Sequence, residues 1–92
     1  MELSKEERKK QKVLEVFFNE EGRIDQLPVK LSKKKIIFEK ILEDFEKDKK
    51  YPEKEVNEII ERYFDDYCTV RRYFIELGMM TRKDGIYIKS SY

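Results

Sequence analysis

The stretch TVRRYFIELGMMTRKDGIYI, residues 69–88, combines the signals of a helix, a helix stop and a β-hairpin. The apolar side chains of its first half share one helical face: Val70, Tyr73, Phe74 and Leu77. Gly78 follows directly and predicts the end of that helix. Residues 79–83 and 86–89 then flank Asp84 and Gly85, the pair that type I′ hairpin turns favour because both central residues need positive φ.

The region before this stretch predicts an additional helix and an extended arm. Ser4 and Glu7 have the spacing of a capping box, and the pattern after them predicts a first helix over residues 4–20. Gly22 is a natural stop for it. Residues 23–27 alternate in polarity before Pro28, which predicts a short edge strand or an extended arm over residues 21–31.

Two further helices are expected in the middle of the chain. Ser32 is the predicted cap of the first, and Pro52 the predicted first residue of the next. Either Asp65 or Asp66 is placed to cap the helix that begins the opening stretch. The apolar faces of the two middle helices are Phe38, Ile41, Leu42 and Phe45 in one and Val56, Ile59, Ile60, Tyr63 and Phe64 in the other.

Composition limits the class of protein. Ninety-two residues suit one domain with one core, and six Phe and six Tyr can build that core although 45% of residues are charged. One cysteine and no histidine exclude an internal disulfide and a structural zinc site of the usual ligands. No apolar run approaches the roughly 20 residues of a membrane span. We therefore expect a soluble, cytoplasmic protein without membrane contact, metal or cofactor.

The order of elements predicts an α+β, mostly helical fold that resembles a winged helix-turn-helix. Three helices are followed by a C-terminal β-hairpin, and Lys50 and Tyr51 are the expected site of a small strand between the first two of them. The hairpin must lie against the helices because two strands alone are marginally stable. We predict one domain over residues 1–92, with an N-terminal helix (1–20), an extended arm (21–31) and a winged-helix-like core (32–92).

Three segments resemble a bacterial family known as domain of unknown function 2087. They are GRIDQLPVK, KKYPEKEVNEII and DDYCTVRRYFIELGMMTR. The family pattern is matched at Gly22-Arg23, Pro28 to Lys30, Tyr51 to Asn57, and Asp66 with Arg71-Arg72, so the resemblance covers about residues 17–88. It implies a winged-helix-like, regulatory protein, because family members occur alone or behind the DNA-binding domains of transcription regulators.

A first candidate site combines basic residues of the fourth helix and the hairpin. Residues 71–92 carry a net charge of +3, against −5 for residues 41–70. In winged helices the corresponding helix enters the major groove, so Arg71, Arg72, Arg82 and Lys83 predict weak nucleic-acid contact. Arg72 lies opposite the apolar face and is the better placed of the two helical arginines. The alternative is that Arg71 pairs with Asp66 or with a glutamate of the third helix to hold the fold together.

A second candidate site is the lysine cluster, which we define as Lys30, Lys33, Lys34 and Lys35 at the expected start of the second helix. Lysines here oppose the helix dipole, at a cost of about 0.3 to 1 kcal/mol each. Together with free backbone N–H groups they predict an anion site for a phosphate of nucleic acid or of a small ligand. The alternative is a solvated basic surface.

Cys68 and Ile75 occupy the side of the fourth helix away from its apolar face. One interpretation is that the N-terminal helix or the arm covers them, and the other is an interface with a partner protein or a second copy of the chain.

The sequence offers little for catalysis. It has no histidine and no glycine-rich phosphate loop, and the glutamates of the third helix look solvated. The favoured function is therefore a non-enzymatic regulatory module, associated with transcription, that makes weak nucleic-acid contact. The alternative is a protein-interaction or ligand-sensing module on the same scaffold, including a homodimer.

Overall fold

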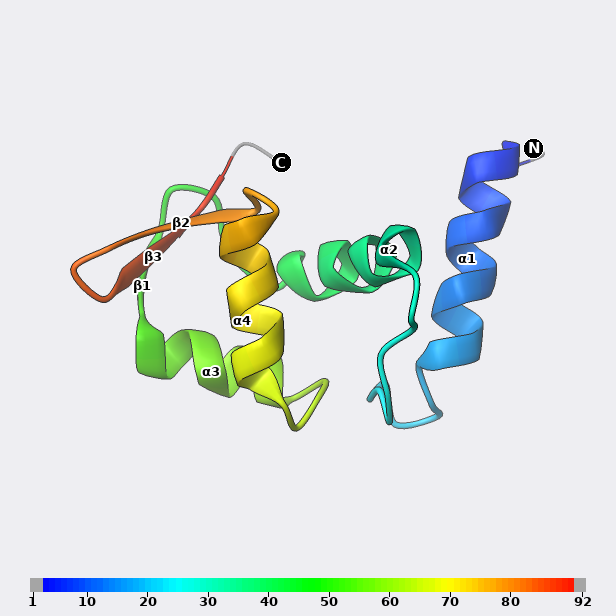
Figure 1. Cartoon of the computed structure of the whole chain (residues 1–92), viewed down its shortest axis with the longest axis horizontal. Helices are drawn as coiled ribbons and strands as arrows, with labels where there is room; N and C mark the ends of the chain where they lie inside the picture. The colour runs from blue at the N-terminus through cyan, green and yellow to red at the C-terminus, as the bar shows by residue number, and fades with distance from the viewer. Residues whose placement is uncertain (1–2, 91–92) are drawn as a thin grey trace.

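The computed structural model describes residues 3–90 and has the predicted α+β, mostly helical fold (Figure 1). Its elements in chain order are α1 (Lys5–Phe17), α2 (Leu31–Leu42), β1 (Lys50–Pro52), α3 (Glu53–Glu61), α4 (Tyr67–Glu76), β2 (Met80–Lys83) and β3 (Ile86–Lys89). The strands form one antiparallel sheet in the order β1-β3-β2. None of these helices has the length and apolar content that crossing a bilayer requires.

The capping box at the start of α1 is confirmed. The Ser4 hydroxyl accepts from the backbone N–H of Glu7 at 3.2 Å and donates to the Glu7 carboxylate at the same distance. The end predicted near residue 20 is wrong, because α1 stops at Phe17. Phe18 turns to extended backbone and forms an isolated bridge with Ile24, which ends the helical hydrogen bonding.

The arm after α1 is a turn rather than an edge strand. Asn19 accepts from the backbone N–H groups of Glu21 and Arg23 through its side-chain oxygen, and Gly22 takes a φ of 77° within this turn. Ile24 then enters the core at 3% exposure, and its N–H donates to the Tyr63 carbonyl at 2.7 Å. Where an edge strand was predicted, the described arm thus forms one isolated bridge, between Ile24 and Phe18.

Two predicted helix starts move, that of α2 by two residues and that of α3 by one. Lys30, not Ser32, occupies the N-cap of α2, and no side chain caps that end. Pro52 is the N-cap of α3 and the last residue of β1 rather than the first residue of the helix. The φ that the proline ring fixes is compatible with both roles, because a strand residue and an N-cap residue both have extended backbone. Asp66 is the cap of α4, where it accepts from the N–H of Thr69 at 3.3 Å and from its hydroxyl at 2.6 Å.

The hairpin has the predicted two-residue turn. Asp84 and Gly85 have φ values of 52° and 77°, and Gly78 ends α4 with a φ of 73°. The register places Arg82 opposite Tyr87, whose other neighbour is Tyr51 on β1.

One hydrophobic cluster extends from Val13 on α1 to Tyr87 on β3. At its centre Phe74 meets Phe38 and Phe45 edge to face, with ring centroids 6.2 and 5.9 Å apart. The molecule measures 42 × 26 × 22 Å, and α1 and the hairpin lie at opposite ends of the long axis (Figure 1). The two ends therefore present separate surfaces.

Candidate functional site

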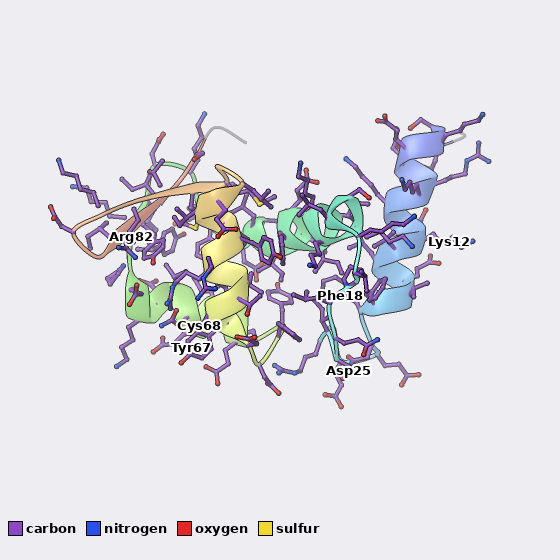
Figure 2. All side chains as sticks on the ribbon, viewed as in Figure 1. Lys12, Phe18, Asp25, Tyr67, Cys68 and Arg82 are labelled. Carbon is purple, nitrogen blue, oxygen red and sulfur yellow. The ribbon has the colours of Figure 1, made fainter. Side chains whose placement is uncertain are left out.

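A cleft of about 520 Å³ lies between the outer face of α4 and the hairpin. We call it the arginine cleft, and its lining consists of Cys68, Arg71, Arg72, Ile75, Glu76, Arg82 and Tyr87. Figure 2 shows Cys68 on α4 and Arg82 on the hairpin at this end of the molecule. The structure thus brings together five of the residues that the sequence placed in two separate candidate sites.

Arg71 is held by α3. Its guanidinium donates to the Asn57 side-chain oxygen at 2.5 Å, and its Nε lies 3.8 Å from the Glu53 carboxylate. The Arg71 side chain is 21% exposed, so these contacts are partly shielded from water. The structure therefore shows the pairing with a helix-three glutamate that the sequence analysis gave as the alternative role of Arg71.

Glu53 differs from the other glutamates of α3 in having partners across the fold, although its side chain is 45% exposed. Its carboxylate accepts from the Tyr87 hydroxyl at 2.9 Å as well as pairing with Arg71. It thereby joins α3, α4 and β3 beneath the cleft. Tyr87 was missed as a site residue, although a two-residue turn at Asp84 and Gly85 fixes Arg82 opposite Tyr87 and so offered a signal.

The other two arginines present their charge to solvent. Arg72 and Arg82 are both exposed, Arg72 on the outer face of α4 and Arg82 on β2. Interaction with the Tyr87 hydroxyl, aided by the charge of Glu53, raises the pKa of Arg82 above its ordinary value. Like any arginine, Arg82 therefore carries its charge at neutral pH.

Lys83 is separated from the arginines by the pleat of the sheet. Successive side chains on a strand point to opposite faces, so Lys83 lies with Lys50, Ile86 and Ile88 along a different hollow. Arg82 lies at the border and lines both hollows. The predicted four-residue group of Arg71, Arg72, Arg82 and Lys83 is thus divided between two faces.

The lysine cluster does not converge on one point. Lys34 donates to the Tyr73 hydroxyl at 3.2 Å and lies 5.2 Å from the centre of its ring. Lys33 and Lys35 line two different hollows against α1, and Lys30 is the exposed N-cap of α2. Anion binding by this cluster stays a prediction, and none of its four lysines lines the arginine cleft.

Cys68 and Ile75 are uncovered. Cys68 is exposed and Ile75 is 37% exposed, because α1 packs against α2 and the arm contacts α3 instead. The interpretation that the N-terminal segments cover these residues is wrong. Both residues add apolar surface to the arginine cleft.

The acidic residues of the middle of the chain gather elsewhere. A hollow of about 670 Å³ between α3 and the segment that precedes β1 contains Asp44, Glu46, Glu55 and Glu58, together with Lys49, Lys54 and Arg62. The arginine cleft has a single acid, Glu76, in its lining. Within residues 3–90, no group of three Cys, Asp or Glu side chains is arranged to hold a metal ion.

Fold and cleft together define a small α+β domain with a basic cleft between a helix and a hairpin. The chain belongs to a bacterial family, described as an uncharacterized protein conserved in bacteria (DUF2087), whose model matches residues 23–89. No curated protein and no solved structure gives a significant match.

Several residues that carry the family resemblance serve the fold. Arg23 donates to the Glu61 carbonyl at 2.6 Å and pairs with Asp65 at 2.5 Å, which ties the arm to the end of α3. Asn57 holds Arg71, and Asp66 caps α4. Among the residues quoted for the resemblance, Arg72 is the one whose charged group stands exposed in the cleft.

Proposed function

We propose that the chain is a non-enzymatic, winged-helix-like regulatory module that contacts the phosphate backbone of nucleic acid through the arginine cleft. The observation that carries the proposal is the cleft itself, whose lining holds three arginines and one acid, Glu76, with Arg72 and Arg82 exposed and Arg71 paired to Glu53 beneath it. Arginine is well suited to phosphate because its planar fork can donate two parallel hydrogen bonds. The proposal also includes a role in transcription regulation, which the family resemblance implies.

The arrangement of elements supports the winged-helix comparison. The order α2-β1-α3-α4-β2-β3 has the small strand between the first two helices of the core, and β1 pairs with β3 at the edge opposite β2. In that comparison α4 is the recognition helix and the hairpin is the wing. The cleft lies between these two elements.

The charges on α4 favour contact between the side of this helix and the phosphate backbone of nucleic acid. They disfavour insertion of its N-terminal end into a groove. Asp65 and Asp66 stand at the start of α4, where they repel phosphate and where Asp66 already occupies the cap. Arg72 and Arg82 lie farther along and are exposed. Two phosphate contacts predict weak binding whose constant falls about tenfold between about 50 and 200 mM salt.

The test is fluorescence anisotropy of a labelled duplex DNA at these two salt concentrations. We expect Arg72→Ala with Arg82→Ala to remove most of the salt-dependent binding. Arg62→Ala is the matched control, since Arg62 is exposed and lies in the acidic hollow on α3. Absence of binding at the lower salt would refute the proposal, as would a loss of less than twofold for the double variant.

A second candidate function is the binding of an acidic peptide, or of a second copy of the chain, in the same cleft. The apolar contribution of Ile75 and Cys68 to the lining favours it, because phosphate gains nothing from these groups. Ile75→Ala separates the two functions. It should leave DNA binding within twofold, whereas it should weaken binding of an acidic peptide or dimerisation measured by sedimentation.

A further inference from the structure

A second basic surface lies at the other end of the molecule, where α1 crosses α2. It is a hollow of about 300 Å³ that we call the lysine groove, lined by Lys9, Lys12, Val13, Val16, Phe17 and Lys33. Every charged side chain in this lining is a lysine, and the remaining residues are apolar. A ligand for this groove must therefore bring both negative charge and apolar surface.

The lysines of the groove are not neutralised by the protein. Across residues 3–90, no ion pair joins Lys9, Lys12 or Lys33 to a carboxylate. Lys9 also borders a neighbouring hollow on the far side of the crossing, where Lys10 and Lys35 lie with Leu31, Ile36, Glu6 and Glu39. The positive charge thus extends across the junction of the two helices.

Exposed aliphatic side chains accompany these lysines. Val16 is 68% exposed within the groove, and Leu31 is 47% exposed in the neighbouring hollow. Val29, just before α2, is 92% exposed. Apolar surface surrounded by polar groups is typical of a protein interaction site, and a phosphate backbone would leave it unused.

The groove is also too far from the arginine cleft to be part of it. Lys12 and Arg82 lie toward opposite ends of the molecule, whose long axis is 42 Å (Figure 2). A ligand of this end is therefore separate from whatever the cleft binds, and the inference does not depend on the proposed function.

We propose that the lysine groove docks an acidic amphipathic helix of another protein. Apolar side chains on one face of that helix pack on Val16 and Phe17, and carboxylates beside them pair with Lys9, Lys12 and Lys33. A groove between two helices suits a helical ligand, which presents its apolar anchors at i, i+3 or i+4, and i+7. The lysines select an acidic partner by charge complementarity.

The test uses the full chain and a labelled synthetic peptide of about 18 residues, long enough to form a helix when bound. The peptide carries leucines at i, i+3 and i+7 and glutamates beside them. A second peptide has the same composition in an order that scatters the leucines around the helix. Anisotropy titrations should show at least tenfold tighter binding of the first peptide.

Three variants locate the binding site. Lys12→Glu with Lys33→Glu should weaken binding of the first peptide at least tenfold. Lys47→Glu with Lys54→Glu makes the same change in net charge at exposed positions outside the groove, and it should weaken binding less than twofold. Val16→Asp should also weaken binding at least tenfold, and its thermal unfolding should be unchanged because Val16 is exposed.

Four results would overturn this proposal. The first is equal binding of the two peptides, and the second is an equal loss for the two double variants. The third is a larger loss of duplex DNA binding in Lys12→Glu with Lys33→Glu than in Arg72→Ala, which would assign the groove to nucleic acid. The fourth is self-association of the chain that Lys12→Glu with Lys33→Glu abolishes. This result would assign the lysine groove to a second copy of the chain.

Discussion

The helix α1 and the body from α2 to β3 differ in how they are held. Val13 is the one buried side chain of α1, whereas α2, of similar length, buries five. The described core residues apart from Val13 all lie between Ile24 and Tyr87, within the segment 23–89 that the family model matches. Most of the folding free energy therefore resides in the family segment, and α1 is a helix attached to its outside.

The charges of the two regions differ in the same way. Within the family segment, residues 23–89, Arg71 and Arg23 make contacts that join elements distant in sequence. On α1 and the start of α2, lysines form no ion pairs among the described residues. Arg71 and Arg23 thus stabilise the fold, whereas the lysines of α1 and of the start of α2 remain available to a ligand, as Arg72 and Arg82 do in the arginine cleft.

The largest expected effect comes from removing a large side chain from the hydrophobic core of the body. Phe74→Ala removes a ring that contacts Phe38 and Phe45, and we expect a loss of about 3 to 5 kcal/mol in the free energy of unfolding. Val13→Ala removes less apolar surface and should cost about 1 to 2 kcal/mol. Urea denaturation of both variants measures the contrast, and equal losses would contradict the division into body and attachment.

Removing a cap from each region gives the next contrast. Asp66→Ala leaves the start of α4 without its side-chain acceptor, at a cost of about 1 kcal/mol in global stability. Ser4→Ala should cost no more than about 0.5 kcal/mol globally, because α1 can fray without exposing much of the core. Denaturation gives the global values, and circular dichroism should show some loss of helix in Ser4→Ala. A Ser4→Ala variant as destabilised as Asp66→Ala would mean that α1 folds as one unit with the body.

Two neighbouring arginines on α4 allow a charge that stabilises the fold, that of Arg71, to be compared with an exposed charge, that of Arg72. Arg71→Ala should lower the free energy of unfolding by about 1 kcal/mol, because Asn57 and Glu53 lose a partly shielded partner. Arg72→Ala should change it by less than about 0.5 kcal/mol. Both can be measured in one denaturation series, and the reverse order of effects would contradict the assigned roles.

A pH-dependent effect is expected at the contact between the two regions, where Tyr63 lies against Phe18 and hydrogen-bonds to Asp44. Burial, with that hydrogen bond, raises the pKa of Tyr63 from 10.0 to about 12. The unfolded chain therefore releases this proton at a lower pH than the folded chain, so stability falls as the pH rises from about 10 to 12.

The control for this pH dependence is Tyr63→Phe, which has no proton to lose. The wild-type chain should lose more stability than Tyr63→Phe between about pH 10 and 12. A parallel absorbance titration should show one tyrosine that ionises later than the others. Identical pH profiles of the two proteins would show that Tyr63 is not held in this way.

Much of the fold could be predicted because its signals are local. The Ser4 cap, the Gly78 stop and the Asp84-Gly85 turn each depend on a few neighbouring residues, and the structure confirms all three. The end of α1 was predicted too late because a bridge from Phe18 to the arm competes with the helix. That bridge forms between residues brought together by a turn at Asn19, which helical periodicity does not register.

The candidate site was predicted only in part. Arg72 was correctly expected to stand exposed, since its position on the wheel follows from the helical repeat. Lys83 was grouped with the arginines, and in the structure it shares a hollow with Arg82 but not with Arg71 or Arg72, because side chains alternate along β2. The role of Glu53 was missed because its partners come from α4 and β3, far away in sequence.

The sequence by itself determined the secondary structure, the hairpin register and the face that each helix buries. These depend on caps, turn residues and hydrophobic period, which act over a few residues. Only the tertiary structure decided that Arg71 is held by α3, that Cys68 and Ile75 share a cleft with the arginines, and that the lysine cluster meets α1. Such pairings follow from how the helices cross around one core, and the crossing depends on every packed side chain at once.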